Sequence, residues 1–166
     1  MKTAKLYLKT NVALYALLFI SFAILTIANQ SHAAEKIEIS KAWIRATPPS
    51  AMAAGGYLEI TNNTNRDETL VGVEFSQAGK SEIHEMKMDD GVMKMRPLKQ
   101  GITIPAGKSI LLKPGGFHLM FMSMKSQMKA GENHLVKLTF SHSGVMEIDF
   151  PVLEMATGKK LMMQED

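Results

Sequence analysis

Short alternating runs of apolar and polar residues, separated by turn-forming residues, follow one another along most of this chain. Alternation over a few residues is typical of a half-buried β-strand, and Gly, Pro, Asn and Asp mark the turns between strands. The runs cover residues 37–45, 56–60, 70–75, 81–88, 92–98, 102–104, 109–112, 117–122, 134–140 and 145–152. No amphipathic helix pattern of convincing length and no internal repeat interrupts them. The pattern predicts an all-β protein built as a sandwich or barrel.

The N-terminus has the pattern of a secretory signal peptide. Three lysines stand in the first nine residues, an apolar run covers residues 12–28, and small residues follow. A basic start, an apolar run and a small-x-small cleavage site are typical of such a peptide. We expect cleavage after Ala33, with Ala28 and Ala34 as alternatives. An uncleaved membrane anchor is the other interpretation, although the run is shorter than the roughly 20 residues that span a bilayer comfortably.

Three parts follow from this pattern: a signal peptide over residues 1–33, one β domain over 34–154, and a flexible tail over 155–166. The 133 residues left after cleavage suffice for one domain with its own hydrophobic core. The tail is mostly polar, and terminal segments of this kind fray. The predicted location is the periplasm.

Charge gives no reason to expect a nucleic-acid partner. The first 33 residues hold three lysines and no acid, so the 19 basic residues of the chain fall to 16, equal to its 16 acidic residues. A nucleic-acid-binding surface needs clustered basic residues. We therefore expect no nucleic acid as partner and, after cleavage, no membrane span.

The chain contains no cysteine and 14 methionines. An exported domain of this composition is stable without disulfides. Blue-copper electron-transfer sites, iron–sulfur clusters, thiol nucleophiles and lipid-anchored lipoproteins are excluded, since each needs a cysteine. Seven of the methionines lie between Met86 and Met124, on the segments that also carry His84 and His118.

Histidine and methionine recur at fixed spacing in the predicted strands. One strand carries His84 and Met86, the next carries Met95, and a later strand carries His118 and Met120. Imidazole and thioether ligands without a carboxylate favour soft Cu(I) over zinc, calcium or magnesium. The spacing therefore predicts a Cu(I) site.

A hairpin would bring the first three of these side chains to one face. Residues two apart on a strand share a face, so His84 and Met86 point the same way. If residues 89–90 form the loop, His84 lies opposite Met95; if residues 90–91 form it, Met86 lies opposite Met95. In either register the His and Met side chains share one face, and directly opposed Cβ atoms are about 5 Å apart.

The later strand repeats the arrangement. His118 and Met120 share one face, while Leu119 and Phe121 point to the other, where we expect the core. The sequence leaves open whether the face of His118 adjoins the face of His84.

Core packing is the alternative explanation for the methionines, because Met fills irregular gaps in a hydrophobic core. A His-x-Met pair repeated in two segments favours ligands instead. His134 and His142 are expected at the surface, and turn chemistry explains the acidic pair at residues 89–90.

The stretch that carries these residues resembles the periplasmic copper chaperones of the PCu(A)C type. Their pattern is a His, about ten residues, a Met, about twenty-one or twenty-two residues, then His-x-Met. Here ten residues separate His84 from Met95, and twenty-two separate Met95 from His118. Similar blocks occupy residues 42–49, 54–57, 90–97 and 113–120, so the resemblance runs from about residue 37 to about residue 152.

This resemblance implies a cupredoxin-like Greek-key β-sandwich that binds one Cu(I) per chain. Carried over by position, the ligands are His84, Met95, His118 and Met120, and Met86 matches an optional methionine. It also implies delivery of copper to the cytochrome c oxidase copper centres, CuA in particular. The expected partner is then the CuA subunit or another copper chaperone. We expect the protein itself to be a monomer.

Three classes of function are compatible with such a site. A metallochaperone passes Cu(I) to a dedicated acceptor, whereas a periplasmic copper buffer or tolerance protein has the same site without one. A redox enzyme is disfavoured because cysteine is absent and no hydrolytic arrangement of residues is visible. The sequence predicts a metallochaperone that is not an enzyme, with the buffer as the alternative.

Overall fold

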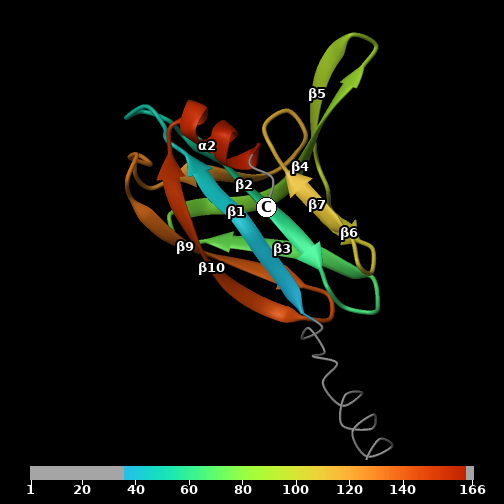
Figure 1. Ribbon diagram of the computed structural model, residues 1–166. Coiled ribbons are helices and arrows are strands. Elements are labelled where there is room, and N and C mark those ends of the chain that lie inside the picture. The colour runs from blue at the N-terminus through green and yellow to red at the C-terminus, as the bar shows by residue number, and fades with distance from the viewer. Residues whose placement is uncertain (1–35, 164–166) are drawn as a thin grey trace, which may run out of the picture. The chain divides into compact units, whose positions relative to one another are not determined.

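Strands make up nearly all of the computed structural model, which describes residues 36–163 (Figure 1). The signal peptide and cleavage site predicted within residues 1–35 lie outside the described residues, as do residues 164–166. The strands are β1 (Ile37–Arg45), β2 (Ala53–Asn62), β3 (Glu68–Phe75), β4 (Ala78–Asp89), β5 (Val92–Pro97), β6 (Ile102–Ile104), β7 (Ser109–Leu112), β8 (Phe117–Met124), β9 (Asn133–Phe140) and β10 (Gly144–Leu153). Every strand predicted from the alternation is present, and the all-β prediction is confirmed.

The strands pair in the order β5-β4-β8-β2-β1-β10-β9-β3-β6, and β7 pairs with β2. Among the described strands only β1 and β10 run parallel, with Ile44 opposite Val152. The two ends of this order fold onto each other, since Phe75 of β3 packs against Phe121 of β8 with ring centroids 4.8 Å apart. The result is a β-sandwich whose core lies between the layers.

The core consists of the inward-facing residues of each strand. Leu119 and Phe121 are fully buried, as the alternation of β8 predicts. Trp43 is also fully buried and stacks against Tyr57, with ring centroids 4.6 Å apart. Because β8 commits these residues to the core, His118 and Met120 must lie on its other face.

The C-terminal segment, predicted as a flexible tail, begins with helix α2 (Met155–Met162). Gly158 is the buried residue of this helix, and a Cβ atom at that position would come within 2.3 Å of the Trp43 ring. The helix therefore lies directly on the indole, a contact that the polar composition of the segment did not reveal. Across residues 36–163 the structure has no helix with the length and apolar character needed to span a membrane.

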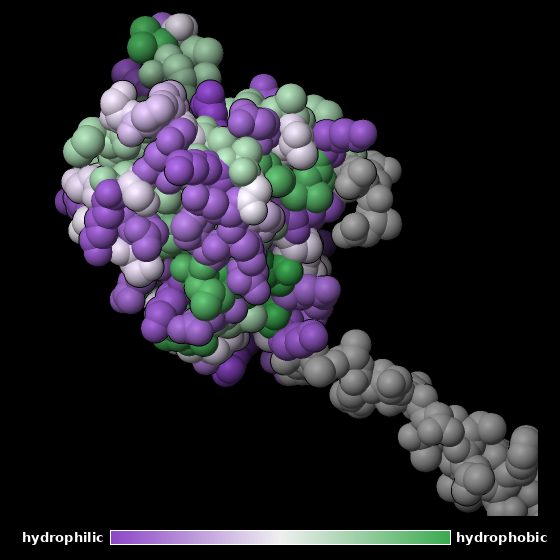
Figure 2. Space-filling model, turned by 90° about the vertical axis from the view of Figure 1, so that its left-hand side faces the viewer, coloured by the Kyte–Doolittle hydropathy of each residue, from purple (hydrophilic) through white to green (hydrophobic). Residues whose placement is uncertain are grey.

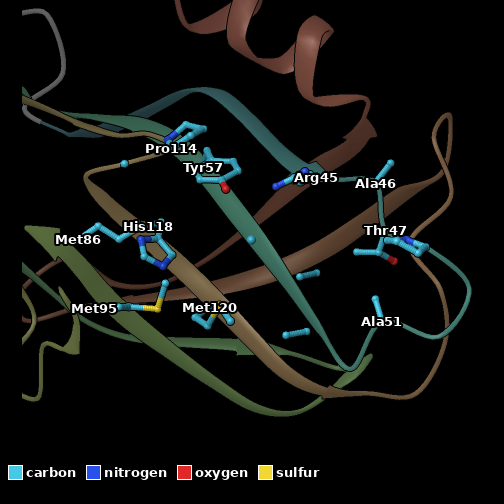
Figure 3. A pocket seen from close by; sticks show the side chains of 15 residues that line it. Arg45, Ala46, Thr47, Ala51, Tyr57, Met86, Met95, Pro114, His118 and Met120 are labelled. Atoms are coloured by element: carbon cyan, nitrogen blue, oxygen red, sulfur yellow. The ribbon is translucent and has the colours of Figure 1, made fainter. Parts of the chain in front are cut away.

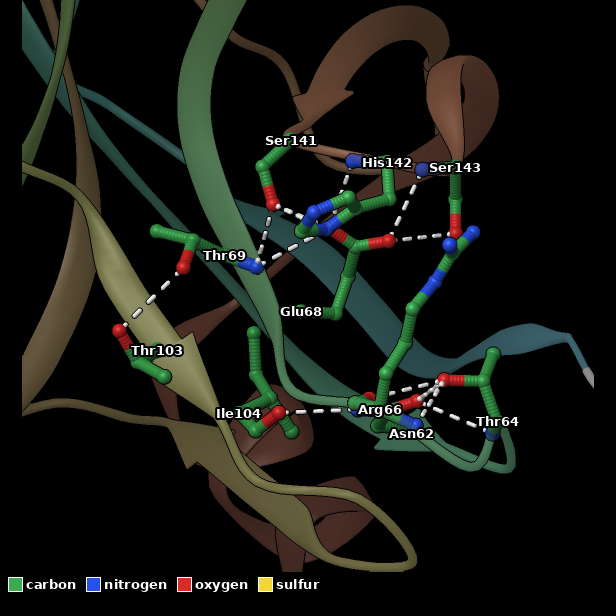
Figure 4. A network of polar contacts seen from close by, with 10 residues as sticks. All are labelled: Asn62, Thr64, Arg66, Glu68, Thr69, Thr103, Ile104, Ser141, His142 and Ser143. Atoms are coloured by element: carbon green, nitrogen blue, oxygen red, sulfur yellow. Dashed lines mark hydrogen bonds and ion pairs between the residues drawn. The ribbon is translucent and has the colours of Figure 1, made fainter.

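A buried polar network joins β3 to the turn between β9 and β10 (Figure 4). The Glu68 carboxylate is 1% exposed and accepts hydrogen bonds from the backbone N–H groups of Thr69, His142 and Ser143 and from the hydroxyls of Ser141 and Ser143. Burial alone would raise the pKa of Glu68, but these donors outweigh it and hold the pKa far below its ordinary value. The carboxylate is thus an ionised anchor for this end of the sandwich.

Candidate metal centre

The register of the β4–β5 hairpin is set by its two-residue loop. Asp90 and Gly91 have φ angles of 50° and 76°. Positive φ at both central residues defines a type I′ turn, whose twist matches that of the flanking strands. Met86 therefore lies opposite Met95, and the alternative register, with His84 opposite Met95, is wrong.

Strand β8 lies on the other side of β4 and brings the second His/Met segment to the first. His84 is directly opposite His118, and the two rings meet edge to face with centroids 5.7 Å apart. Met120 is opposite Glu82 on β4 and opposite Gly55 on β2. The two faces therefore adjoin, which was the open question from the sequence.

A cleft of about 400 Å³ opens beside this face (Figure 3). Met86, Met95, His118 and Met120 lie together on one side of it, and the segment from Arg45 to Ala51 lies across from them. The cleft is lined by Arg45, Ala46, Thr47, Pro48, Ala51, Ala53, Ala54, Gly55, Tyr57, Met86, Met95, Pro114, Gly115, His118 and Met120. His84 is not part of this lining, and its ring contacts the His118 ring edge to face.

The proton on His118 is fixed by a backbone contact. Its Nδ1 lies 3.1 Å from the carbonyl oxygen of Gly116. A carbonyl can only accept, so Nδ1 carries the proton and the lone pair is on Nε2. Burial lowers the pKa of His118, the hydrogen bond to Gly116 opposes this, and the charge of His84 lowers the pKa further. His118 is thereby held as a neutral imidazole whose Nε2 lone pair is free to bind a metal.

The proton on His84 is fixed by a carboxylate. Nε2 of His84 lies 2.9 Å from an oxygen of Glu82; an ionised carboxylate can only accept a hydrogen bond, so Nε2 carries the proton and donates it. Hydrogen bonds from Lys80 and then from His84 lower the pKa of Glu82. The lone pair of a neutral His84 is then on Nδ1, which is buried and has no hydrogen-bond partner among the described residues.

An unpartnered buried nitrogen is costly in a folded protein and asks for an explanation. Metal coordination supplies one, because metal-bound histidines commonly donate their other ring N–H to a carboxylate or a carbonyl. Both histidines meet this description, one through Glu82 and the other through Gly116. The residues present therefore fit a metal ion held by nitrogen and sulfur.

Glu82 was missed by the sequence analysis. Its position two residues before His84 on a strand was the available signal, since such residues share a face. The carbonyl of Gly116, which accepts a hydrogen bond from His118, could not be predicted from the sequence, because every residue has a backbone carbonyl.

Core packing does not explain the methionines of the hairpin. Met88, Met93 and Met95 are 57%, 46% and 46% exposed. Met124 and Met128, by contrast, are buried in the core. These three thioethers of the hairpin are therefore available to a ligand.

The remaining histidines lie apart from this centre. His142 is exposed, as expected, whereas His134 is half-buried with its ring edge against Phe75, at a centroid distance of 5.6 Å. Within residues 36–163 no group of three or more His, Cys, Asp or Glu side chains could hold a metal ion.

Comparison with known proteins gives both a family and a fold. The family model "Putative lipoprotein LpqE-like" matches residues 37–152. "Putative lipoprotein Lxx21020" of Leifsonia xyli subsp. xyli is 34% identical over 119 residues, which are 72% of this chain and 70% of that protein.

Two solved structures share the architecture. The copper-bound PCuAC domain from PmoF2 superposes with a TM-score of 0.60 at 23% identity, covering 72% of this chain and 93% of that domain. The solution structure of CuI-DR1885 from Deinococcus radiodurans also gives a TM-score of 0.60, at 25% identity, covering 78% of this chain and 87% of that one. The sandwich is therefore cupredoxin-like, as the resemblance implied.

Proposed function

This chain belongs to the LpqE-like family, and on that premise we propose that it is a periplasmic Cu(I)-binding metallochaperone. One Cu(I) would be held by His84, Met95, His118 and Met120. The observation that carries the proposal is the direct opposition of His84 and His118, beside a cleft lined by the thioethers of Met86, Met95 and Met120. The PmoF2 domain was solved with copper and DR1885 with Cu(I), which supports the same cargo here.

The donor set explains the choice of oxidation state. Two neutral imidazoles and two neutral thioethers leave the charge of the bound ion unchanged, and thioether sulfur is a soft ligand that prefers Cu(I). The carboxylate of Glu82 pairs with Lys80 and His84, so it supports a histidine ligand and is not counted among the metal ligands. A hard divalent ion would find too few oxygen ligands at this face.

The same donors explain transfer. A neutral thioether is a weaker ligand than a thiolate, so an acceptor's cysteine sulfurs could replace the methionines one at a time. Met95 is 46% exposed and is the natural first point of exchange. This stepwise ligand exchange needs no oxidation or reduction of the metal, and it makes the protein a carrier rather than an enzyme.

The destination is proposed from the PCu(A)C resemblance. Cytochrome c oxidase copper centres, CuA in particular, would receive the Cu(I), either directly or through another copper chaperone. Export would follow from the signal peptide pattern of residues 1–33. Although the family name speaks of a lipoprotein, the 166 residues contain no cysteine to which a lipid could be attached.

A competition titration tests the site. The protein is titrated against a colorimetric Cu(I) chelator beside the His84→Ala/His118→Ala double variant, with the exposed His142→Ala as the matched control. We expect one tight equivalent in the protein and in the control, and none in a double variant that still gives the circular dichroism spectrum of a β-sandwich. Equal affinity in all three would refute the site.

Transfer to an acceptor distinguishes the chaperone from the copper buffer. The Cu(I)-loaded protein is mixed with an apo CuA domain, and the rate is compared with that for the Cu(I)-loaded chelator at the same free Cu(I) concentration. A chaperone transfers faster than free exchange allows. A rate set only by the free Cu(I) concentration would favour the buffer.

A further inference from the structure

The β4–β5 hairpin carries a second pair of opposed methionines beyond the cleft. Met88 lies directly opposite Met93, one step further along the hairpin than the pair formed by Met86 and Met95. Neither Met88 nor Met93 lines the cleft. Both are largely exposed, at 57% and 46%.

All four thioethers share the face that carries the histidines. Met86 and Met88 follow His84 at two-residue steps on β4, and their partners on β5 lie directly across. The other face carries charges, where Asp89 pairs with Lys94 and Arg96 at 2.7 and 3.3 Å. The hairpin therefore presents a ladder of sulfur on one side and an ion-pair network on the other.

The hairpin projects from the sandwich, so this ladder is accessible (Figure 1). In the space-filling view, hydrophobic and intermediate side chains gather at the projecting tip, above a face that is mostly hydrophilic (Figure 2). Exposed apolar groups clustered on a projecting element indicate binding rather than packing. Along this face the hairpin contributes four methionines and, opposite His84, Pro97; the predominance of thioethers favours a ligand for sulfur over a general apolar partner.

The spacing allows three of these sulfurs to reach one ion. Directly opposed Cβ atoms lie about 5 Å apart, and residues two apart on a strand are separated by roughly 7 Å. The methionine side chain has three rotatable bonds and adapts to such gaps. Met88, Met93 and Met95 form the most exposed set of three.

From this arrangement we infer that Met88, Met93 and Met95 form a second, weaker site for Cu(I), through which the ion enters and leaves the His84/His118 centre. The inference rests on the proposed function and adds the route of the cargo. Met95 belongs to both sets of ligands. The ion therefore moves inward as bonds to Met88 and Met93 break and bonds to the imidazoles form, and outward by the reverse exchange.

The test follows the methionine methyl groups by NMR during titration with Cu(I) under reducing conditions and, in parallel, with redox-inert Ag(I). Met88→Leu/Met93→Leu removes both outer sulfurs and keeps the side chains apolar and similar in volume. Met163→Leu, at an exposed methionine on the far end of the chain, is the matched control.

With the unsubstituted protein, the first equivalent shifts the methyl resonances of Met95 and Met120. The second equivalent shifts those of Met88 and Met93 and shifts that of Met95 again, since Met95 belongs to both sets of ligands. The Leu double variant keeps the first equivalent, loses the second, and releases Cu(I) to a chelator more slowly. Met163→Leu behaves like the unsubstituted protein.

The failures are distinguishable. Absence of the first equivalent would overturn the proposed function itself. A first equivalent without any shift at Met88 and Met93, or release rates unchanged in the Leu double variant, would overturn the second site alone. If Leu preserves transfer to an apo-acceptor but Met88→Ser/Met93→Ser abolishes it, the hairpin tip is an apolar docking surface and the inference is wrong.

Discussion

His84 and His118 face each other across the β4–β8 ladder, and each has one ring nitrogen committed to a hydrogen bond and the other left free. The committed nitrogens differ: Nε2 of His84 contacts Glu82, whereas Nδ1 of His118 contacts the Gly116 carbonyl. A Cu(I) ion between them would therefore bind Nδ1 of one ring and Nε2 of the other. This asymmetry makes the supporting groups testable separately from the ligands.

Replacement of Glu82 by glutamine should weaken Cu(I) binding without unfolding the protein. The amide can still accept from Nε2 of His84, but it no longer favours that tautomer as the carboxylate does. Loss of such a supporting group typically costs about 10- to 100-fold in metal affinity. The chelator competition measures the affinity, and imidazole ¹⁵N chemical shifts report the tautomer of His84.

Glu85→Gln is the matched control, since Glu85 lies on the opposite face of the same strand. If Glu82→Gln left both the affinity and the ¹⁵N shifts unchanged, Glu82 would have no positioning role.

Met95→Ala should lower Cu(I) affinity while changing the free energy of unfolding little. Met95 is 46% exposed on a hairpin that projects from the sandwich, so truncation leaves no cavity in the core. Chemical denaturation of the apo-protein and chelator competition give the two quantities. A large loss of stability with unchanged affinity per folded molecule would instead support a packing role.

Cu(I) affinity should be level at neutral pH and fall in acid. Binding needs neutral imidazoles, and burial holds the pKa of His118 below its ordinary value of 6.5, so protons compete only at lower pH than for an exposed histidine. The stability of the apo-protein should change in the same direction. Because the pKa of His118 is lowered in the folded state, the unfolded chain binds the proton more readily, so the free energy of unfolding falls as the pH drops below 6.5. Titrations at several pH values with an acid-stable chelator measure the decline. An affinity independent of pH down to about pH 4 would exclude histidine ligands.

Glu68→Gln should destabilise the fold by about 1–3 kcal/mol, because the amide NH₂ would face hydrogen-bond donors that now meet a carboxylate. The lowered pKa of Glu68 means that its contribution is present above the ordinary value of 4.5 and is lost as the pH falls below it. Urea denaturation between about pH 7 and pH 3 should therefore show a steeper acid decline in the unsubstituted protein than in the variant. The exposed Glu74→Gln on the same strand should behave like the unsubstituted protein.

Gly158→Ala should destabilise helix α2 although alanine is the better helix former. A Cβ atom there would come within 2.3 Å of the Trp43 ring, and such overpacking costs typically about 1–3 kcal/mol. Trp43 is the single tryptophan, so its fluorescence reports the change directly. Thr157→Ala, at an exposed neighbouring position, should leave the emission unchanged. Identical spectra and stability for both variants would mean that α2 is not held on the indole.

Local sequence was sufficient for the strands and for the faces of their side chains. The two-residue alternation placed His84 and Met95 on one shared face of the hairpin, and His118 on the face of its strand opposite Leu119, because successive side chains of a strand point to opposite faces. The absence of cysteine and the presence of thioethers indicated the kind of metal for a similar reason, since ligand chemistry belongs to the side chain and not to the fold.

Tertiary structure decided which of these faces meet. His84 and His118 come from strands separated by three others in the chain, and only the pairing of β4 with β8 makes them neighbours. Tertiary structure also determined that Glu82 and the Gly116 carbonyl hydrogen-bond the two histidines, and that helix α2 packs on Trp43. The physical reason is that alternation acts between adjacent residues, whereas strand pairing, proton placement and burial depend on groups that folding brings together from distant parts of the chain.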